Sequence, residues 1–505
     1  MRIGIDVGGT NTDAALIGDG GQVLATVKSP TTEDVTGGVA AAIAGLGATE
    51  ASAVMIGTTH FVNALVEAAR LEPVAAVRLG LPATAALPPL VDWPDRLREA
   101  VEGAVYLCHG GHEYDGTPIS ALDPGELRRV AADIRARGLR TVAISSVFSP
   151  VSADSERQAA DILAAELGPE VHLSLSHEIG RVGLLARENA TIVNAALRPL
   201  AGRTVAAFAE ALAVAGIRAP LFLSQNDGTL MDVDHARRYP VATFASGPTN
   251  SMRGAAYLSG LTDCAVVDIG GTTTDVGILN GGFPREAAGE ALVAEVRTNF
   301  RIPDVLSIGI GGGSIVAADG SVGPRSVGYR LTAEALVFGG GTLTATDLAV
   351  AAGQAVVGDP ARVTGVDHER PLKIIAERVA EAVDRMRTSA APLPVVLVGG
   401  GSILVGELPG FADVRRPDHY EVANAVGAAI AQVGGEVDRV FSGPRESVLA
   451  EAKNEAVARA ERAGARAGSV RIVDVEELPL AYLPGDATRV RIKAVGDLDL
   501  EKIDA

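Results

Sequence analysis

One eight-residue pattern occurs twice in this sequence and constrains the fold more than any other feature. Residues 6–13 read DVGGTNTD, and residues 268–275 read DIGGTTTD. Each copy lies between two short apolar runs, an order typical of a strand, a tight turn and a second strand. We therefore expect two equivalent hairpins whose tips carry glycine, hydroxyl and carboxylate groups.

The residue types in these turns are suited to binding a polyphosphate. Glycines tolerate positive φ and let backbone N–H groups approach an anion, while the threonines add hydroxyl donors. Asp6 and Asp268 precede the turns, where a carboxylate makes sense mainly if a cation such as Mg²⁺ lies between it and a phosphate. The alternative is two ordinary hairpins in which Gly, Asp and Thr only shape the turn. Neither copy has the ending of a P-loop or the glycine spacing of a dinucleotide fold.

A third glycine-rich string, VLVGGGS (396–402), follows an apolar run. Glycines at the end of a strand allow a flat nucleoside to lie against the backbone. The string alone has little specificity, because IGIGGGSI (308–315) resembles it closely.

Composition limits the class of protein. The chain has 505 residues, 47% of them hydrophobic, and a formal net charge of −18. The size allows a large core and two or more domains, and the charge argues against a nucleic-acid or anionic-membrane partner. Two cysteines are too few for a disulfide framework. We find no signal peptide and no apolar run of about 18 residues, so we expect a cytoplasmic protein without a membrane span.

The order of predicted elements indicates an α/β protein. Helical and strand patterns alternate through residues 124–180, and a helix over 187–200 is expected to stop at Pro199. A helix of small residues is predicted over 421–435. The last 70 or so residues hold one charged helix and two or three strands, which indicate a small α+β appendage. We predict domains at 1–200, 201–438 and 439–505.

Several further strings carry a resemblance to a known family. They are GTTHFVNAL (57–65), LSLSHEIG (173–180), RENATIVNAALRPL (187–200), YPVATFASGPTNSMRGA (239–255), IGGGSI (310–315) and LTATDLAVAAG (343–353). In this order the chain resembles the hydantoinase A / 5-oxoprolinase family, within the actin, Hsp70 and sugar-kinase superfamily. The resemblance implies duplicated ribonuclease H-like α/β domains that close on ATP in an interdomain cleft.

The resemblance also implies an activity. Members of the family use ATP to open cyclic amides such as hydantoins, 5-oxoproline and lactams, and relatives carboxylate ketones. Many work with a separate B-type subunit, so we expect a homo- or hetero-oligomer. The implied chemistry is phosphoryl transfer from ATP to the amide carbonyl oxygen, in which positioning and charge neutralisation carry catalysis.

The resemblance assigns roles to particular residues. The metal, Mg²⁺ or Mn²⁺, is assigned to Asp6 and Asp268, and catalysis to these two and Asp275. Nucleotide contacts are assigned to Gly8, Gly9, Thr10, Asn11, Thr12, Gly270, Gly271, Thr272, Thr273, Gly399, Gly400, Gly401 and Ser402. Substrate contacts are assigned to Thr58, Thr59, His177, Glu178 and Asp347.

Several alternatives stay open at this point. Asp347 is as well suited to capping a helix as to contacting a substrate. His177 and Glu178 are equally suited to a solvated loop. The loop CHGGHEYDG (108–116) holds His109, His112 and Glu113, which suit either a metal site or, preferably, a polar loop. The chain differs from the family at Ile56, where a histidine is usual. Two functions also remain as alternatives to the opening of a cyclic amide. The protein could be a small-molecule kinase, or a non-catalytic, ATP-driven partner or reactivating protein.

Overall fold

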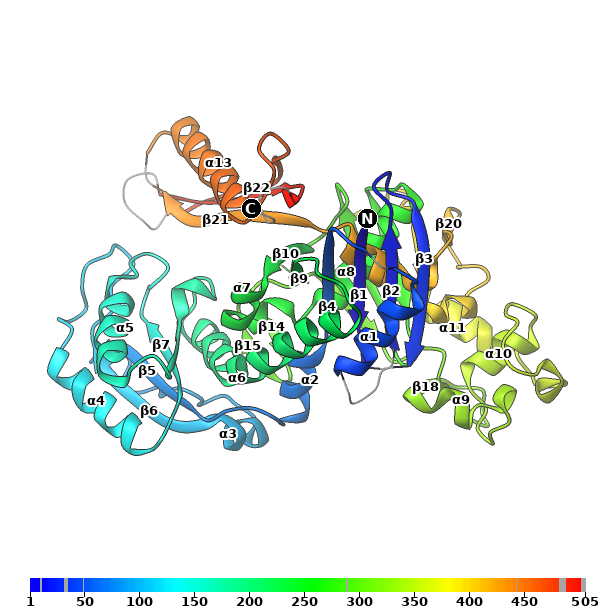
Figure 1. Cartoon of the computed structure of the whole chain (residues 1–505), viewed down its shortest axis with the longest axis horizontal. Coiled ribbons are helices and arrows are strands. Elements are labelled where there is room, and N and C mark those ends of the chain that lie inside the picture. Colours follow the sequence, from blue (N-terminus) through cyan, green and yellow to red (C-terminus); the bar gives the residue numbers. More distant parts are fainter. Residues whose placement is uncertain are drawn as a thin grey trace.

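Two sheets with the same core topology form the centre of the molecule (Figure 1). A computed structural model describes residues 1–9, 11–30, 35–48, 50–287, 289–441, 443–480 and 487–500. The strands of the first sheet lie in the order β22 (Arg471–Pro479), β23 (Thr488–Gly496), β21 (Gln432–Phe441), β10 (Thr229–Asp232), β9 (Leu221–Ser224), β4 (Ala53–Thr58), β1 (Arg2–Val7), β2 (Asn11–Ile17) and β3 (Val23–Pro30).

The second sheet repeats this arrangement. Its strands lie in the order β13 (Phe283–Pro284), β12 (Thr274–Asn280), β11 (Cys264–Ile269), β19 (Val395–Val398) and β20 (Val414–Arg415), and β16 (Val305–Ile308) also pairs with β12. β11 is antiparallel to β12 and parallel to β19, as β1 is antiparallel to β2 and parallel to β4. The two halves are therefore duplicated α/β domains, as predicted.

Two helices cross between the sheets at glycines. A Cβ built at Gly427 in α12 (Ala423–Ala429) would lie 1.8 Å from the carbonyl oxygen of Asn250 in α8 (Ser246–Ser259). A Cβ at Gly254 would lie 1.8 Å from the carbonyl oxygen of Ala423. No side chain larger than hydrogen fits at either crossing, so small residues set the distance between the lobes.

The predicted helix over 421–435 is shorter than expected. It ends at Ala429, and β21 begins at Gln432. Val433 and Val437 are buried in the core beneath α13 (Arg445–Arg462), and their alternation suits a strand. The adjacent Gly434 and Gly435 have no preference for helix, so burial decides the structure here.

A third sheet, parallel throughout, is inserted into the first domain at the left of Figure 1. It contains β6 (Glu102–His109), β5 (Val74–Leu81), β7 (Thr141–Ser146) and β8 (His172–Leu175), and the helices α3 (Asp95–Val101), α4 (Pro124–Ala136) and α5 (Asp154–Leu167) accompany it. The other principal helices are α1 (Val35–Gly45), α2 (His60–Glu67), α7 (Val233–Arg238), α10 (Ala345–Ala351) and α11 (Glu369–Met386).

Helix α6 joins the inserted sheet to the first domain and corrects two expectations. It runs from Leu184 to Val214, straight through Pro199, where the sequence predicts an end. Proline removes one backbone hydrogen bond, but most of α6 is buried, and packing along its length offsets the loss. The predicted boundary at residue 200 therefore falls inside a continuous helix.

The other predicted boundary also differs from the structure. β9 and β10 lie after residue 200, yet they pair into the first sheet beside β4. The C-terminal appendage is α+β as predicted, but its strand β21 pairs with β10 and extends the same sheet. Sequence pattern gives no sign of which sheet a strand joins, and this is why both boundaries are misplaced.

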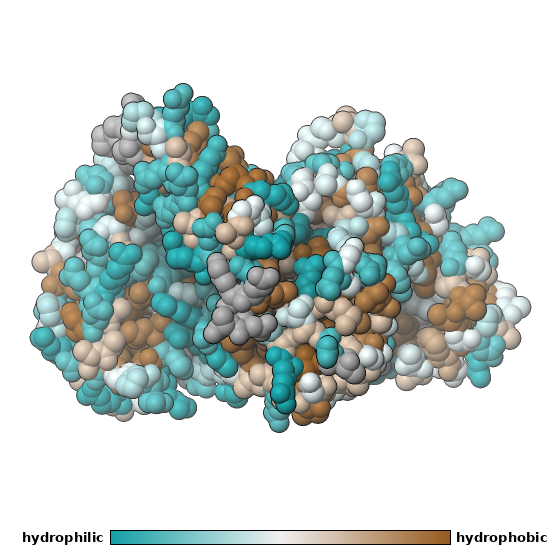
Figure 2. Space-filling model, turned by 45° about the horizontal axis from the view of Figure 1, so that its top comes forward, coloured by the Kyte–Doolittle hydropathy of each residue, from teal (hydrophilic) through white to brown (hydrophobic). Residues whose placement is uncertain are grey.

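The surface agrees with a globular α/β chain. Hydrophilic residues cover much of the face shown in Figure 2, with apolar residues in separate patches. Within the part of the chain that the structure describes, no helix is both long and apolar enough to cross a membrane.

Candidate functional site

The two repeated turns have the same internal structure. Asp6 pairs with Asp13 across the first hairpin, and Asp268 pairs with Asp275 across the second. Each turn closes with one backbone hydrogen bond, from Gly8 N to the Asn11 oxygen at 3.0 Å and from Gly270 N to the Thr273 oxygen at 2.9 Å. The sequence repeat is thus a structural repeat, although Thr10 lies outside the described residues.

Side chains distant in sequence converge on the first hairpin. The Asn424 amide, at the start of α12, donates to Asp6 Oδ2 and to Asp13 Oδ2, each at 2.9 Å. The Lys28 ammonium on β3 contacts both Asp13 oxygens, at 2.9 and 3.0 Å, and donates to the Glu421 carbonyl at 3.2 Å. One amide and one ammonium therefore hold two buried carboxylates in fixed positions.

The carboxylates of both hairpins influence one another. Burial, and after it the charges of Asp13 and Asp268, raise the pKa of Asp6 to about 7. Burial also raises the pKa of Asp268, and it raises that of Asp275 to about 6, where the Asp268 charge adds to the effect. The carboxylates of the two turns therefore lie close enough to influence one another's charge, and a cation between them would favour the ionised forms.

Polar atoms without partners point to a bound group at this place. Asp6 Oδ1 and the side-chain amide atoms of Asn250 on α8 are buried without a hydrogen bond of normal geometry, although the Asn250 amide lies close enough to lower the pKa of Asp6. Both groups border Gly57, where a Cβ would lie 2.4 Å from Asp6 Oδ1 and 2.4 Å from Asn250 Nδ2. Buried polar groups are nearly always satisfied, so these oxygens and nitrogens fit a hydrated cation or a phosphate.

The third glycine string lies against the second turn. Gly399 follows β19 with φ +81°, and a Cβ there would lie 2.2 Å from Asp268 Oδ1. Gly400 to Leu404 form a short 3-10 helix, in which Ser402 is buried and its Oγ has no hydrogen bond. Residues 399–402 thus lie against Asp268 and the second turn.

The similar string over 308–315 packs against the second turn as well. Gly312 N donates to the Gly270 oxygen at 2.9 Å, and Gly313 N donates to the Gly271 oxygen at 2.7 Å. In the sequence, this string serves as an example of low specificity, and its part IGGGSI (310–315) is one of the strings that carry the family resemblance. In the structure it buttresses the second turn, and its glycines permit that close approach.

Five predicted substrate residues lie in three different places. Thr58 and Thr59 end β4 beside the first turn, where the Thr59 hydroxyl donates to the Val7 oxygen at 3.4 Å and Thr58 Oγ1 contacts His60 Nδ1 at 2.7 Å. His177 and Glu178 line a separate pocket on the inserted side. These two pairs therefore belong to different sites.

Asp347 lies in the interior of the second domain. It is fully buried and forms a capping box with Thr344 at the start of α10. Its carboxylate accepts hydrogen bonds from Thr344 N at 2.7 Å and Val337 N at 2.7 Å. The capping alternative is confirmed, and Asp347 does not line the space between the turns.

The loop of residues 108–116 is also explained as a polar loop. His112 is buried and contacts Ser152 Oγ at 3.4 Å, and His109 contacts Glu126 at 3.3 Å. Among the described residues, no group of three or more His, Cys, Asp or Glu side chains is arranged as a ready metal site. Any cation between the turns would therefore complete its shell with water and phosphate oxygens.

Four residues of this site escape sequence reasoning. They are Asp13, Lys28, Asn250 and Asn424. Asp13 ends the repeated pattern as Asp275 does, and Lys28 is its partner in the register of β2 and β3. The hairpin pattern therefore contained a signal for Asp13 and Lys28. Asn250 and Asn424 reach the site from crossing helices. No spacing in the sequence connects them to Asp6.

Duplicated domains, each with a carboxylate-bearing turn close to that of the other, define the actin, Hsp70 and sugar-kinase class of fold. The chain belongs to the hydantoinase/oxoprolinase family. Its residues 2–167 match the hydantoinase/oxoprolinase N-terminal region, and residues 187–358 match the hydantoinase/oxoprolinase domain.

Curated relatives include subunits of two enzymes. The caprolactamase subunit alpha of Pseudomonas jessenii is 28% identical over 427 residues, covering 75% of this chain and 58% of that protein. The acetophenone carboxylase gamma subunit of Aromatoleum aromaticum is 26% identical, covering 47% of this chain and 34% of that protein. The chain therefore spans between about a third and three-fifths of the length of these relatives.

Solved structures confirm the fold. The crystal structure of an ATP-dependent caprolactamase from Pseudomonas jessenii is 19% identical with a TM-score of 0.78, over 98% of this chain and 87% of that one. A nucleotide-free acetone carboxylase is 18% identical with a TM-score of 0.68, over 99% of this chain and 88% of that one.

Proposed function

We propose that this protein is an ATP-dependent component that activates a cyclic amide for ring opening. The observation that carries the proposal is the convergence of two register-matched turns on one buried cluster of carboxylates. An Asp6 oxygen and an Asn250 amide without hydrogen bonds of normal geometry lie in that cluster. Such a cluster is costly to bury without a ligand, and a nucleotide phosphate with its cation fits the donors present.

Each half of the site has a separate part in holding ATP. The backbones of Gly8–Gly9 and Gly270–Thr273 would bind phosphate oxygens, with Asn11 and Thr12 bordering the first turn. Gly399–Ser402 would face the nucleoside. Asp6 and Asp268 would hold Mg²⁺ or Mn²⁺, with Asp275 beside them. When bound, the cation would neutralise charge on the phosphates.

The chemistry that this arrangement supports is phosphorylation of an amide. The carbonyl oxygen of the cyclic amide attacks the γ-phosphorus of ATP, the bond to the β-phosphate oxygen breaks, and ADP leaves. The imidate phosphate that forms is a far better electrophile than an amide. Water then adds to its carbon, and the C–N bond of the tetrahedral adduct breaks as the ring nitrogen takes a proton, which gives an acyl phosphate. A second water hydrolyses the acyl phosphate, and phosphate and the ring-opened carboxylate are released.

The substrate class rests on the relatives and on Thr58 and Thr59. Both threonines lie beside the first turn, where an acceptor for the γ-phosphoryl group would lie. One relative is named as a caprolactamase subunit and another as a carboxylase subunit. We propose a lactam, hydantoin or 5-oxoproline as substrate, and a B-type subunit as the partner that completes hydrolysis.

A direct assay measures ADP release with Mg²⁺ and a panel of caprolactam, hydantoin and 5-oxoproline, with and without a B-type subunit. We expect one cyclic amide to stimulate ADP release and Asp268→Asn to abolish the stimulation. Asp161→Asn, on the exposed side of α5, is the matched control. A stable phosphorylated product would show a kinase instead, and ATP binding without any small-molecule dependence would show a non-catalytic partner.

A further inference from the structure

A second pocket lies apart from the paired turns, between the inserted sheet and the C-terminal appendage. Its volume is about 720 Å³, and its walls come from the loops after β7 and β8, from α7, and from β21 and β23. Its lining residues include Asp154 on α5, His235 on α7 and Asp438 on β21, and Figure 1 shows α5 and α7 apart from the hairpin of β1 and β2. Apart from its two residues His177 and Glu178, nothing above assigns it a role.

One wall of this pocket concentrates arginines. Arg301 Nη2 and both Nε and Nη2 of Arg489 bond to Asp438, at 2.6, 2.7 and 2.6 Å. Arg491 bonds to Glu436 behind them at 3.3 Å. Arg301 also pairs with Glu436, so both Arg301 and Arg489 already have carboxylate partners on β21.

Arg181 is the guanidinium with unused capacity. Its Nη2 reaches Glu286 at 3.3 Å, and its Nε is buried without a hydrogen bond. Burial lowers the pKa of Arg181, against the charges of Glu286 and Asp438, which raise it, and burial with the charges of Arg491 and Arg181 lowers that of Arg301 to about 10. Burial thus disfavours the charged form of both guanidinium groups, and an anion in the pocket would favour it.

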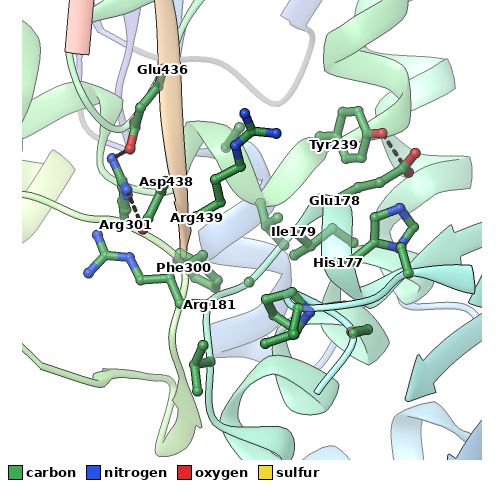
Figure 3. A pocket seen from close by; sticks show the side chains of 18 of the residues that line it. His177, Glu178, Ile179, Arg181, Tyr239, Phe300, Arg301, Glu436, Asp438 and Arg439 are labelled. Atoms are coloured by element: carbon green, nitrogen blue, oxygen red, sulfur yellow. Dashed lines mark hydrogen bonds and ion pairs between the residues drawn. The ribbon is translucent and has the colours of Figure 1, made fainter. Parts of the chain in front are cut away.

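The opposite wall and the floor are of another character. Figure 3 shows His177, Glu178 and Tyr239 across the pocket from Arg181 and Arg301, with Ile179 and Phe300 between them. Glu178 is already bonded to Arg238 at 2.9 Å and Tyr239 at 2.7 Å. His177 Nδ1 is held by the buried Glu156 at 2.6 Å, and the other ring nitrogen makes no hydrogen bond among the described residues.

We propose that this pocket is a second ligand site, for a small molecule with a carboxylate group. The carboxylate would bind Arg181 and Arg301, whose planar guanidinium groups match its geometry. A short hydrocarbon body would lie against Phe300 and Ile179, and a polar end would reach His177. Because Glu178 and Asp438 already have basic or hydroxyl partners, an amine would find no equivalent place beside Arg181.

The network of ion pairs has a structural role as well. Arg301 bonds to Asp438 on β21, so it attaches the appendage to the rest of the molecule, whereas Arg489 on β23 pairs with Asp438 inside the appendage. That structural role explains why the guanidinium groups of Arg301 and Arg489 bond to Asp438. It does not account for the open volume lined by Arg181, whose guanidinium has Glu286 as its one carboxylate partner among the described residues, and this arrangement favours a ligand.

The test is calorimetric titration of the whole chain, without nucleotide, using hexanoate, 6-aminohexanoate and hexylamine. We expect both carboxylates to bind and hexylamine not to bind. Arg181→Gln should weaken carboxylate binding by about tenfold or more, the loss of one charge-assisted contact, and Arg181→Lys should weaken it less. Arg98→Gln, an exposed arginine on α3 outside the pocket, is the matched control and should bind normally.

Circular dichroism and the melting temperature establish that each variant folds. Failure of both carboxylates to bind the wild-type chain would overturn the proposal, and so would equal binding by Arg181→Gln. Binding of hexylamine as tight as that of hexanoate would overturn the assignment of the anionic head. The proposal does not depend on ATP, so none of these results bears on the paired turns.

Discussion

Replacing Asp6 by asparagine should stabilise the metal-free protein while it abolishes ATP turnover. Asp6 is 5% exposed, and one of its oxygens makes no hydrogen bond of normal geometry. Its pKa is raised from 3.8 to about 7, first by burial and then by the charges of Asp13 and Asp268. Asparagine has nearly the same shape and can still accept the Asn424 hydrogen bond, but it carries no charge.

The sign and size of the change in folding stability follow from the pKa of Asp6. A carboxyl whose folded-state pKa lies above its unfolded value binds more protons when folded, so its contribution to stability falls as the pH rises from about 4 to about 7. The shift of roughly three units sets a ceiling of about 4 kcal/mol above pH 7. Coupling to Asp13 and Asp268 reduces this, because their titration is shared. We expect Asp6→Asn to gain about 2 kcal/mol more at pH 8 than at pH 5.

The assay is urea unfolding of both proteins in a chelator, without nucleotide, at pH 5 and pH 8. Asp161→Asn serves as control, since its side chain is on the surface, and it should leave both midpoints unchanged. ADP release by Asp6→Asn should be at background. A stability change of the same size at both pH values would refute the reasoning, as would a loss of stability at pH 8.

Three further predictions concern other parts of the molecule. Asp268→Asn should lower stimulated ADP release by about a hundredfold or more, as expected for loss of a charge that positions the phosphates; near-normal release would remove its metal role. Gly427→Ala should lower the melting temperature sharply, because its Cβ would lie 1.8 Å from the Asn250 oxygen, whereas Gly202→Ala, with open space around it, should be neutral or stabilising. Glu188→Gln should cost about 3–5 kcal/mol in urea unfolding because it leaves the buried Arg78 without its charged partner; a cost below about 1 kcal/mol would show that Arg78 finds other acceptors.

The sequence predicted the parts of the fold that local pattern determines. The repeated turns, the hairpins and the α/β alternation of the inserted sheet are all present, because each depends on residues close together in the chain. The end expected at Pro199 is absent, because burial along α6 outweighs the missing hydrogen bond of a proline. The boundary at 200 is misplaced because β9 pairs with the distant β4, and the boundary at 438 because β21 runs across it and pairs with β23.

The candidate site divides in the same way. Asp6, Asp268 and the turn glycines belong to a short pattern that sequence can identify. Asn250 and Asn424 reach that pattern only through the crossing of α8 and α12, and asparagines on a small-residue helix give no warning of it. Asp347 shows the opposite error, because a helix cap and a cleft residue share the same local sequence.

The account depends on both turns binding one nucleotide. The most direct measurement is a crystal structure of the chain with Mg²⁺ and a non-hydrolysable ATP analogue. We expect density for the phosphates between residues 8–12 and 270–273, and for the nucleoside against 399–402. A nucleotide bound elsewhere, or bound to one turn while the other faces solvent, would contradict it.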